Sequence, residues 1–315
     1  MEKLAGIWPA LVTPLTKEGG IHVEATEKLV EDLLATGIGG LYVCGGTGEG
    51  VLLSPALRQE MAELVIRVVA GRVPVMIHVG DITTESAVEL AQHASLVGAD
   101  ALSAIPPFYY SYPFPAILEH YRAIAAASDV PLYIYFIPGA TGTAVTPQQL
   151  LEICAVEGIH GLKYTSQDLH FLSTLLALRD PEKVTVLSGP DELFLPCLSL
   201  GVEGAIGTTY NFMPRLYIDI MQSFLHGEHE TARQLYYAAR RIILVLLRHS
   251  VIAATKALLT TLGYPVGFGV PPMPAIDGQD AKALREELED AGLIELLQRP
   301  ALYGPAGDPM RGKLA

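Results

Sequence analysis

Lys163 ends an apolar run, Ile159–Tyr164, and so places a primary amine where the sequence otherwise predicts a buried strand. Burial removes hydration from an ammonium group, which lowers its pKa by up to a few units and leaves a neutral amine. A neutral amine is a nucleophile that can condense with a carbonyl carbon to form an imine, or Schiff base. The other seven lysines lie in polar, turn-like or helical surroundings. Strand position alone leaves open a lysine that pairs with a carboxylate or extends to solvent.

Tyr135 stands near the end of another apolar run, Leu132–Phe136, and supplies a phenol at the corresponding position. A phenol can donate or accept a proton, so it could serve an imine-forming lysine as a general acid or base. Taken alone, the same tyrosine is equally compatible with a packing role and a satisfied hydroxyl. Its relevance therefore depends on whether the fold brings it beside Lys163.

Two turns add groups that could bind a ligand. The segment Cys44–Gly50 holds four glycines and Thr47 in seven residues, a composition that lets backbone N–H groups converge on a small anion such as a carboxylate. The same composition is also found in tight turns that bind nothing. The segment Pro106–Tyr112 gathers several aromatic side chains, which indicates either an interface or a hydrophobic lid.

The elements that must position these residues follow a β-α alternation. Short apolar runs recur along residues 1–225, and each precedes a turn and a longer stretch with helical periodicity. The eight predicted strands are Gly6–Val12, Gly39–Cys44, Pro74–Val79, Ala101–Ile105, Pro131–Phe136, Ile159–Tyr164, Val184–Ser188 and Gly204–Gly207. Helical stretches between them include Val23–Thr36, Pro55–Val69, Thr84–Val97, Pro115–Ala127 and Pro147–Ala155.

This alternation predicts an α/β fold, a (β/α)8 TIM barrel over residues 1–225, with an open doubly wound sheet as the alternative. Residues 226–300 read as a helical extension packed on the barrel, with helices over Glu228–His249, Ala253–Leu262 and Gln279–Leu297, and residues 301–315 as a tail. In a barrel, catalytic groups come from the carboxyl ends of strands, which is where Lys163 and Tyr135 fall.

Composition narrows the class of protein. The chain has 315 residues, 50% of them apolar, and a net charge of −13, which excludes the basic patch that nucleic-acid binding needs. Three cysteines without a CxxC pattern argue against disulfides and against zinc. The N-terminal run is broken by Pro9 and Pro14, so we expect no signal peptide, no membrane span and a cytoplasmic location. No spacing of His, Asp or Glu resembles a metal site.

Three motifs together carry a family resemblance. The turn Gly46–Glu49, the strand end Tyr135–Pro138 and the segment Gly161–Ser166 resemble the pyruvate-dependent class I aldolases that include N-acetylneuraminate lyase and dihydrodipicolinate synthase. The resemblance runs from about Gly6 to about Pro274 and implies a TIM barrel whose lysine forms a covalent imine with a 2-keto acid, without any other cofactor. It also implies a homotetramer built from two dimers.

The resemblance assigns roles to individual residues. Lys163 forms the imine, Tyr135 transfers protons, and Tyr109 reaches in from a neighbouring subunit as a second tyrosine. Gly46, Thr47 and their amides hold the carboxylate, with Ile137 beside them. Residues that match contacts to the polyhydroxyl tail of a sugar acid are Thr165, Gly189, Asp191, Glu192, Gly207 and Thr208.

Within the family, several stretches are more similar to the N-acetylneuraminate lyase branch than to the synthase branch. The synthase branch usually carries an arginine where this chain has Ala140, and that arginine holds the carboxylate of aspartate semialdehyde. The family usually has Ser or Thr at the position of Gly46, whose Gly-Gly-Thr-Gly-Glu turn is similar to that of keto-deoxy-glucarate dehydratases. Cleavage of a 2-keto sugar acid is thus the leading expectation. Dihydrodipicolinate synthesis, keto-deoxy sugar acid aldol cleavage or dehydration, and a catalytically silent ligand-binding paralogue stay open.

Overall fold

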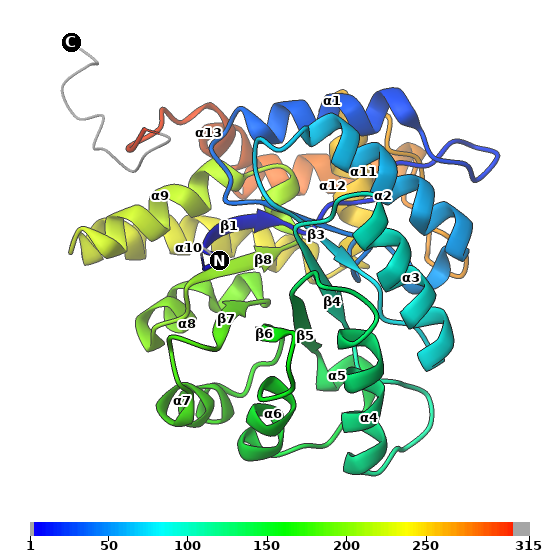
Figure 1. Cartoon of the computed structure of the whole chain (residues 1–315). Helices are drawn as coiled ribbons and strands as arrows, with labels where there is room; N and C mark the ends of the chain where they lie inside the picture. The colour runs from blue at the N-terminus through cyan, green and yellow to red at the C-terminus, as the bar shows by residue number, and fades with distance from the viewer. Residues whose placement is uncertain (1–2, 305–315) are drawn as a thin grey trace.

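Eight parallel strands form a ring in the computed structural model, which describes residues 3–304 (Figure 1). The strands are β1 (Gly6–Pro9), β2 (Leu41–Val43), β3 (Val75–His78), β4 (Ala101–Ala104), β5 (Leu132–Phe136), β6 (Ile159–Tyr164), β7 (Thr185–Ser188) and β8 (Gly204–Gly207). Their order, β1-β8-β7-β6-β5-β4-β3-β2, places each strand beside its neighbours in the sequence. A parallel bridge between Ala10 and Tyr42 joins β1 to β2, so the sheet closes on itself. The predicted TIM barrel is confirmed, and the open doubly wound sheet is excluded.

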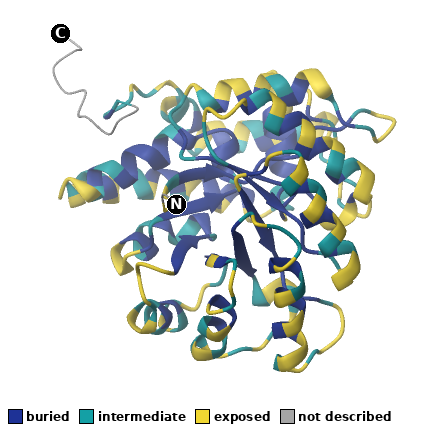
Figure 2. Ribbon diagram, in the orientation of Figure 1, coloured by how far each residue is buried: buried dark blue, intermediate teal, exposed yellow. Residues whose placement is uncertain are grey.

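The strands form where apolar side chains can be buried on both faces. Every residue of β3, β4, β5, β7 and β8 is buried, and β6 exposes only His160 (Figure 2). Strands of this kind need cover on the outside and filling on the inside of the ring, which a parallel barrel provides. The observed strands lie within the predicted runs because those runs were defined by continuous apolarity.

Helices alternate with the strands and cover the outside of the ring (Figure 1). Their starts follow capping chemistry: Ser54 accepts from the amide of Leu57 ahead of Pro55, and Thr146 forms a capping box with Gln149. The barrel helices are α1 (Val23–Leu34), α2 (Pro55–Val69), α3 (Thr84–Leu96), α4 (Phe114–Ala125), α6 (Pro147–Cys154), α7 (Leu169–Leu178), α8 (Phe194–Leu200) and α9 (Pro214–Leu225).

Short helical turns stand at the carboxyl ends of four strands. They are η1 (Gly50–Leu52) after β2, α5 (Pro138–Thr141) after β5, η2 (Asp191–Leu193) after β7 and η3 (Thr209–Asn211) after β8. Each fixes the direction in which the chain leaves the barrel. Most of the residues that the sequence nominates for chemistry lie at or next to these turns.

Within the part of the chain that the structure describes, four helices follow the barrel: α10 (His229–Leu246), α11 (Val251–Thr261), α12 (Gly278–Asp290) and α13 (Leu293–Gln298). The single helix predicted over Gln279–Leu297 is wrong, because Gly292 adopts a left-handed φ of 95° and separates α12 from α13. The division into a barrel over residues 1–225 and an extension over 226–300 stays a prediction. Of the predicted tail, residues 305–315 lie outside the described residues, whereas Tyr303 is buried.

Among residues 3–304, no single helix has both the length and the apolar composition that a membrane crossing requires. The consecutive helices α10 and α11 would meet both criteria together, and they are bent by 106° relative to each other.

Candidate active site

Lys163 lies at the carboxyl end of β6 with its side chain inside the barrel, and only 4% of the residue is exposed. Its Nζ lies 4.1 Å from the centroid of the Tyr135 ring and 4.4 Å from the centroid of the Tyr42 ring. Among residues 3–304 no carboxylate comes within ion-pair distance of this nitrogen; the nearest charge that acts on it is Asp191. Burial lowers the pKa of Lys163 to about 7, against a smaller opposing effect of Asp191. A large fraction of the amine is therefore uncharged near neutral pH.

Tyr135 is brought beside Lys163 by the pairing of β5 with β6, in which the two residues are register partners. It is 5% exposed, and burial raises its pKa to about 12, so its phenol stays protonated over the physiological range. A protonated phenol next to an amine can donate a hydrogen bond to a developing oxyanion and can relay a proton. Tyr135 therefore lies beside Lys163, as its place at the end of the neighbouring strand predicts.

The Gly-rich turn lies at the carboxyl end of β2. Thr47 is buried there, and its Oγ1 lies 2.7 Å from Oγ1 of Thr208 after β8, so the two predicted residues meet across the barrel mouth. Gly50 must be glycine, since a Cβ would stand 1.8 Å from the carbonyl oxygen of Cys44. A Cβ at Gly46 would instead meet only the Tyr135 hydroxyl, at an ordinary 3.5 Å.

Asp191 and Thr165 lie at the ends of β7 and β6, respectively. Oδ2 of Asp191 accepts hydrogen bonds from the amide and hydroxyl of Thr209, at 2.8 Å and 2.7 Å. Its Oδ1 and the Thr165 hydroxyl are buried and make no hydrogen bond of ordinary geometry within the described part of the chain, although the Thr165 side chain acts on the neighbouring Tyr135 and opposes the rise of its pKa. Burial raises the pKa of Asp191 to about 6, so the carboxylate is largely ionised at neutral pH. Two polar groups are therefore ready to bind a ligand.

Glycines make room for both of these side chains. A Cβ at Gly189 would stand 1.7 Å from Oγ1 of Thr165, and a Cβ at Gly207 would stand 1.9 Å from Oδ1 of Asp191. Glu192 stands next to Asp191 in η2, and its carboxylate accepts from Nε2 of Gln167 at 3.5 Å. The predicted substrate residues of β6, β7 and β8 are thus clustered at one end of the barrel.

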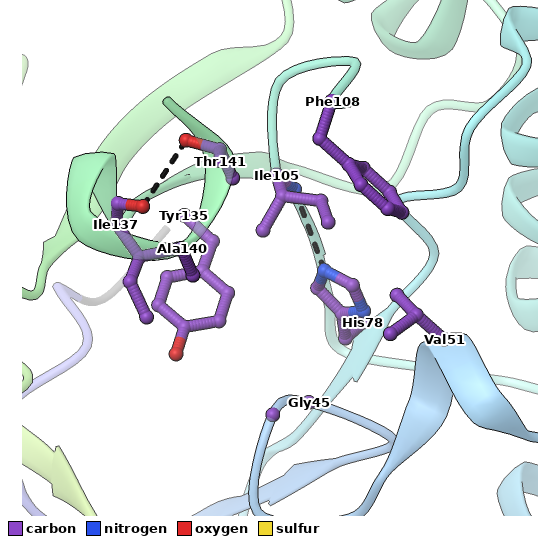
Figure 3. Close-up of a pocket in the computed structure, with 10 residues that line it drawn as sticks. Gly45, Val51, His78, Ile105, Phe108, Tyr135, Ile137, Ala140 and Thr141 are labelled. Atoms are coloured by element: carbon purple, nitrogen blue, oxygen red, sulfur yellow. Dashed lines mark hydrogen bonds between the residues drawn. The ribbon is translucent and has the colours of Figure 1, made fainter. Parts of the chain in front are cut away.

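Tyr135 and residues from several neighbouring loops line a cavity of about 140 Å3 (Figure 3). It is lined by Gly45, Gly46, Val51, His78, Ile105, Phe108, Tyr135, Ile137, Ala140 and Thr141, so the predicted residue Ile137 faces the same space. Most of these side chains are apolar. The Tyr135 hydroxyl points to the side of the cavity where Gly45 lies.

Tyr109 does not join Lys163 within its own chain. It is 83% exposed on the loop after β4, its φ of 79° lies in the left-handed region, and its ring packs edge-on against Tyr110. A left-handed conformation is unfavourable for a tyrosine, which indicates that the position is selected for where it places the side chain. The sequence prediction had assigned Tyr109 to a neighbouring subunit's site.

Two residues of the site were missed from the sequence. Tyr42 on β2 supplies the second aromatic ring beside Lys163. His78 is buried at the end of β3 and lines the cavity, where its Nε2 accepts from the amide of Ile105 at 3.4 Å (Figure 3). Burial, followed by the nearby cations Arg58 and Lys163, holds the pKa of His78 well below its usual value. The strand-end rule that selected Lys163 would also have selected His78.

Residues 3–304 contain no group of three or more His, Cys, Asp or Glu side chains that could hold a metal ion. The absence of any cofactor besides the covalent imine stays a prediction.

Comparison with known proteins decides the family. Residues 3–291 match the model of the dihydrodipicolinate synthetase family. The chain belongs to this family. An N-acetylneuraminate lyase from Rhizobium meliloti is 39% identical over 285 residues, which cover 90% of this chain and 94% of the relative. A 4-hydroxy-tetrahydrodipicolinate synthase from Methanospirillum hungatei is 32% identical over 285 residues, which cover 90% and 98%.

Solved structures of the dihydrodipicolinate synthetase family superpose closely on this barrel. CdNal from Clostridium difficile, solved in complex with mannosamine, matches with a TM-score of 0.88 at 28% identity and covers 92% of this chain and 100% of its own. The resemblance to pyruvate-dependent aldolases is thereby confirmed, as is the expectation of an enzyme from a family whose relatives include carbon–carbon lyases. The individual residue assignments remain predictions.

Proposed function

We propose that this protein is a Schiff-base aldolase that cleaves a 2-keto sugar acid such as N-acetylneuraminate to pyruvate and an aldehyde. The observation that carries the proposal is the amine of Lys163, which is 4% exposed, has no carboxylate within ion-pair distance among residues 3–304 and has a pKa of about 7. A lysine that is buried without an ion pair is rare unless its chemistry is used. The family and the position at a barrel strand end support the same reading.

The reaction begins when the uncharged Lys163 amine attacks the keto carbon. The Tyr135 phenol then donates its proton to the departing hydroxyl, which leaves as water, so that a protonated imine and a transient phenolate remain. The imine withdraws electrons from the bond between the next two carbons of the substrate. The phenolate left on Tyr135 takes the proton of the hydroxyl on the far carbon as that bond breaks, which releases the aldehyde, leaves an enamine on Lys163 and restores the phenol. Protonation of the enamine carbon regenerates the imine, and hydrolysis then frees pyruvate and the amine.

The carboxylate of the keto acid binds at the Gly-rich turn in this proposal. Thr47 donates its hydroxyl, and the backbone amides around Gly46 donate to the same anion. Converging amide groups and a hydroxyl are suitable donors because they carry no charge that would raise the desolvation cost of the site. The apolar side chain of Ile137 lines the same cavity as Gly46, and in this proposal it excludes water from the carboxylate site.

The polyhydroxyl tail lies along the ends of β6, β7 and β8. Asp191 Oδ1 and Thr165 Oγ1 are buried acceptors that make no hydrogen bond of ordinary geometry among residues 3–304 and could bind substrate hydroxyl groups. The remaining tail contacts are Gly189, Glu192, Gly207 and Thr208. Ala140 lines the cavity where an arginine would be needed to hold the carboxylate of aspartate semialdehyde, so cleavage of a sugar acid is favoured over dihydrodipicolinate synthesis.

Assembly and location are part of the proposal. Tyr109 is exposed and lies in a strained backbone conformation beside Tyr110, which supports a role in a neighbouring subunit's site, and a homotetramer of two dimers would supply that neighbour. The partners are thus a small 2-keto acid and further copies of the chain, with no nucleic acid and no membrane. Three buried free cysteines are compatible with a reducing, cytoplasmic location.

Borohydride trapping tests the central claim. Reduction in the presence of pyruvate should attach one three-carbon unit to the peptide that contains Lys163, as read by mass spectrometry. The variant Lys163→Ala should form no adduct, whereas Lys183→Ala, at a lysine whose side chain is 81% exposed, should form it as the native chain does. An unmodified Lys163 in the native protein would favour the silent paralogue.

A substrate panel then separates the reactions. N-acetylneuraminate, keto-deoxy sugar acids and the pair pyruvate with aspartate semialdehyde are assayed for pyruvate release or consumption. Release from N-acetylneuraminate supports the proposal, whereas consumption of pyruvate only with aspartate semialdehyde would assign the protein to the synthase reaction.

A further inference from the structure

Glu49 and Lys256 form a buried ion pair that the proposed mechanism does not use. Nζ of Lys256, on α11, donates to Oε1 of Glu49 at 2.7 Å, and the two side chains are 1% and 0% exposed. The same nitrogen donates to the carbonyl oxygen of Phe268 at 2.8 Å, and the amide of Val270 donates to Oε2 of Glu49 at 2.5 Å. Both carboxylate oxygens are therefore held by the C-terminal part of the chain.

Glu49 is itself part of the Gly-rich turn. Its φ of 58° lies in the left-handed region, where a residue other than glycine is uncommon, although the turn uses glycine at four other positions. Its amide donates to the carbonyl oxygen of Gly46 at 3.0 Å, directly across the turn. The position is thus occupied by a glutamate in spite of its backbone conformation, which indicates that the side chain is needed.

The amides that would bind the substrate carboxylate belong to this turn, and binding depends on their direction. We propose that Lys256 is a positioning residue: by holding Glu49, it fixes the Gly-rich turn in the conformation that binds the substrate's carboxylate. This inference rests on the proposed function of the turn. It adds that α11 and the segment after it are part of the substrate-binding machinery.

Loss of the lysine would act on the turn in a defined way. A buried carboxylate without its cation keeps a large desolvation cost, and it relieves that cost by recruiting other donors or by moving toward water. Glu49 belongs to the Gly-rich turn, so movement of its side chain would shift the backbone amides of the turn, the same groups that the substrate carboxylate needs. The effect should therefore fall on ligands that carry a carboxylate.

A second ion pair of the barrel provides a matched control. Arg179 and Glu203 are joined at 2.8 Å, with side chains 7% and 20% exposed, and Arg179 also donates to the carbonyl oxygens of Val184 and Gly201. Glu203 precedes β8, so this pair lies at the amino ends of the strands, away from the site. Breaking it should reduce stability without reaching the Gly-rich turn.

The experiment compares two ketones of similar size, pyruvate and uncharged pyruvamide. The half-saturating concentration for borohydride trapping on Lys163 is measured for the native chain, Lys256→Met and Arg179→Met. We expect Lys256→Met to raise the value for pyruvate at least about tenfold, since small misplacements in a site have effects of this size or more. The value for pyruvamide should change far less, and Arg179→Met should leave both unchanged.

Two further variants allow the inference to be tested even if Lys256→Met does not fold. Glu49→Gln removes the charge but keeps the shape and hydrogen-bonding ends of the side chain, and Lys256→Arg keeps the cation. Melting curves establish that each variant is folded, and Glu49→Gln replaces Lys256→Met if the latter is not. Equal losses for the two ketones, or no loss for pyruvate, would overturn the inference. A native chain that traps neither ketone would instead refute the proposed function.

Discussion

Tyr135 and Lys163 are register partners on adjacent strands, and Nζ of Lys163 lies 4.1 Å from the centroid of the Tyr135 ring. Partners in a parallel pair direct their side chains to the same face of the sheet, which here is the interior of the barrel. The arrangement places the proposed nucleophile and the proposed proton-transfer group side by side through backbone pairing alone. It also surrounds the amine with aromatic carbon, which accounts for much of its desolvation.

The pH dependence of imine formation follows from this environment. Only the uncharged amine attacks a ketone, so the trapping rate with pyruvate should rise with pH, with a midpoint near the Lys163 pKa of about 7. An ordinary lysine would give a midpoint near about 10.4. The Tyr135 pKa of about 12 lies above the working range, so the rate should level off at alkaline pH. Initial trapping rates between about pH 5 and 9, roughly two units on either side of the expected midpoint, measure that midpoint. A rate still climbing steeply at the alkaline limit would contradict the buried, unpaired amine.

Replacement of Lys163 by methionine should stabilise the protein while removing its chemistry. The pKa of this lysine is lower in the folded chain, about 7, than in the unfolded chain, about 10.4, so unfolding takes up a proton between these values. The resulting destabilisation is complete below about pH 7 and disappears as the pH rises through about 10. Lys163→Met should therefore raise the melting temperature at pH 6 by several degrees, and the gain should shrink at pH 9. Calorimetry at both pH values, with Lys183→Met as the control, tests this; a variant that melts lower at both would show that the lysine contributes to stability.

Substitution of Tyr135 by phenylalanine separates proton transfer from imine formation. The ring would keep its contact with Lys163, whereas the hydroxyl that takes the substrate proton would be lost. General acid–base assistance typically contributes ~10²–10⁴-fold, so kcat for cleavage should fall by about that factor. Trapping of pyruvate on Lys163 should persist at a reduced rate, and Tyr133→Phe, on the same strand, serves as the control. Retention of full cleavage activity in Tyr135→Phe would assign proton transfer to another group.

The barrel and the strand-end residues could be predicted because they depend on local patterns. Continuous apolarity identifies a doubly buried strand, and closure of eight such strands fixes which ends carry function, so Lys163 and Tyr135 follow from position and residue type. His78 obeys the same rule. It was not predicted as a site residue because a histidine at the end of an apolar run can equally be a packing residue. The break at Gly292 was missed because an isolated glycine within a helical pattern does not by itself end a helix.

Contacts between distant segments could not be predicted from local patterns. Thr47 meets Thr208 across 161 positions, and Glu49 meets Lys256 across 207, and both contacts depend on how the closed ring and the following helices pack. On the sequence, Lys256 looks like an ordinary lysine within a helix. Only the packing of α11 behind the Gly-rich turn turns it into a buried partner of Glu49. The polar atoms of Asp191 and Thr165 left without hydrogen bonds of ordinary geometry likewise become visible only once the surrounding side chains are placed.

Gly46 gives the last prediction, because neither the backbone nor the packing requires a glycine there. Its φ lies outside the left-handed region, and a Cβ would meet only the Tyr135 hydroxyl, at 3.5 Å. The cavity that Gly46 and Tyr135 both line can accommodate a water molecule or a serine side chain beside the Tyr135 hydroxyl. Gly46→Ser should therefore fold with unchanged stability, within about 0.5 kcal/mol. It should also keep cleavage activity, because the serine hydroxyl can make the hydrogen bond to the Tyr135 hydroxyl that a water would otherwise make.

Gly46→Ala distinguishes a hydroxyl from mere bulk at this position. It fills the same room without a hydrogen-bonding atom, so it should lower kcat about tenfold, the effect of one lost hydrogen bond of roughly 1.4 kcal/mol. Steady-state kinetics on both variants, with melting curves to establish folding, provide the comparison. If alanine and serine reduce kcat equally, the space beside Tyr135 is occupied by the substrate itself, and the proton passes between Tyr135 and the substrate without an intermediary.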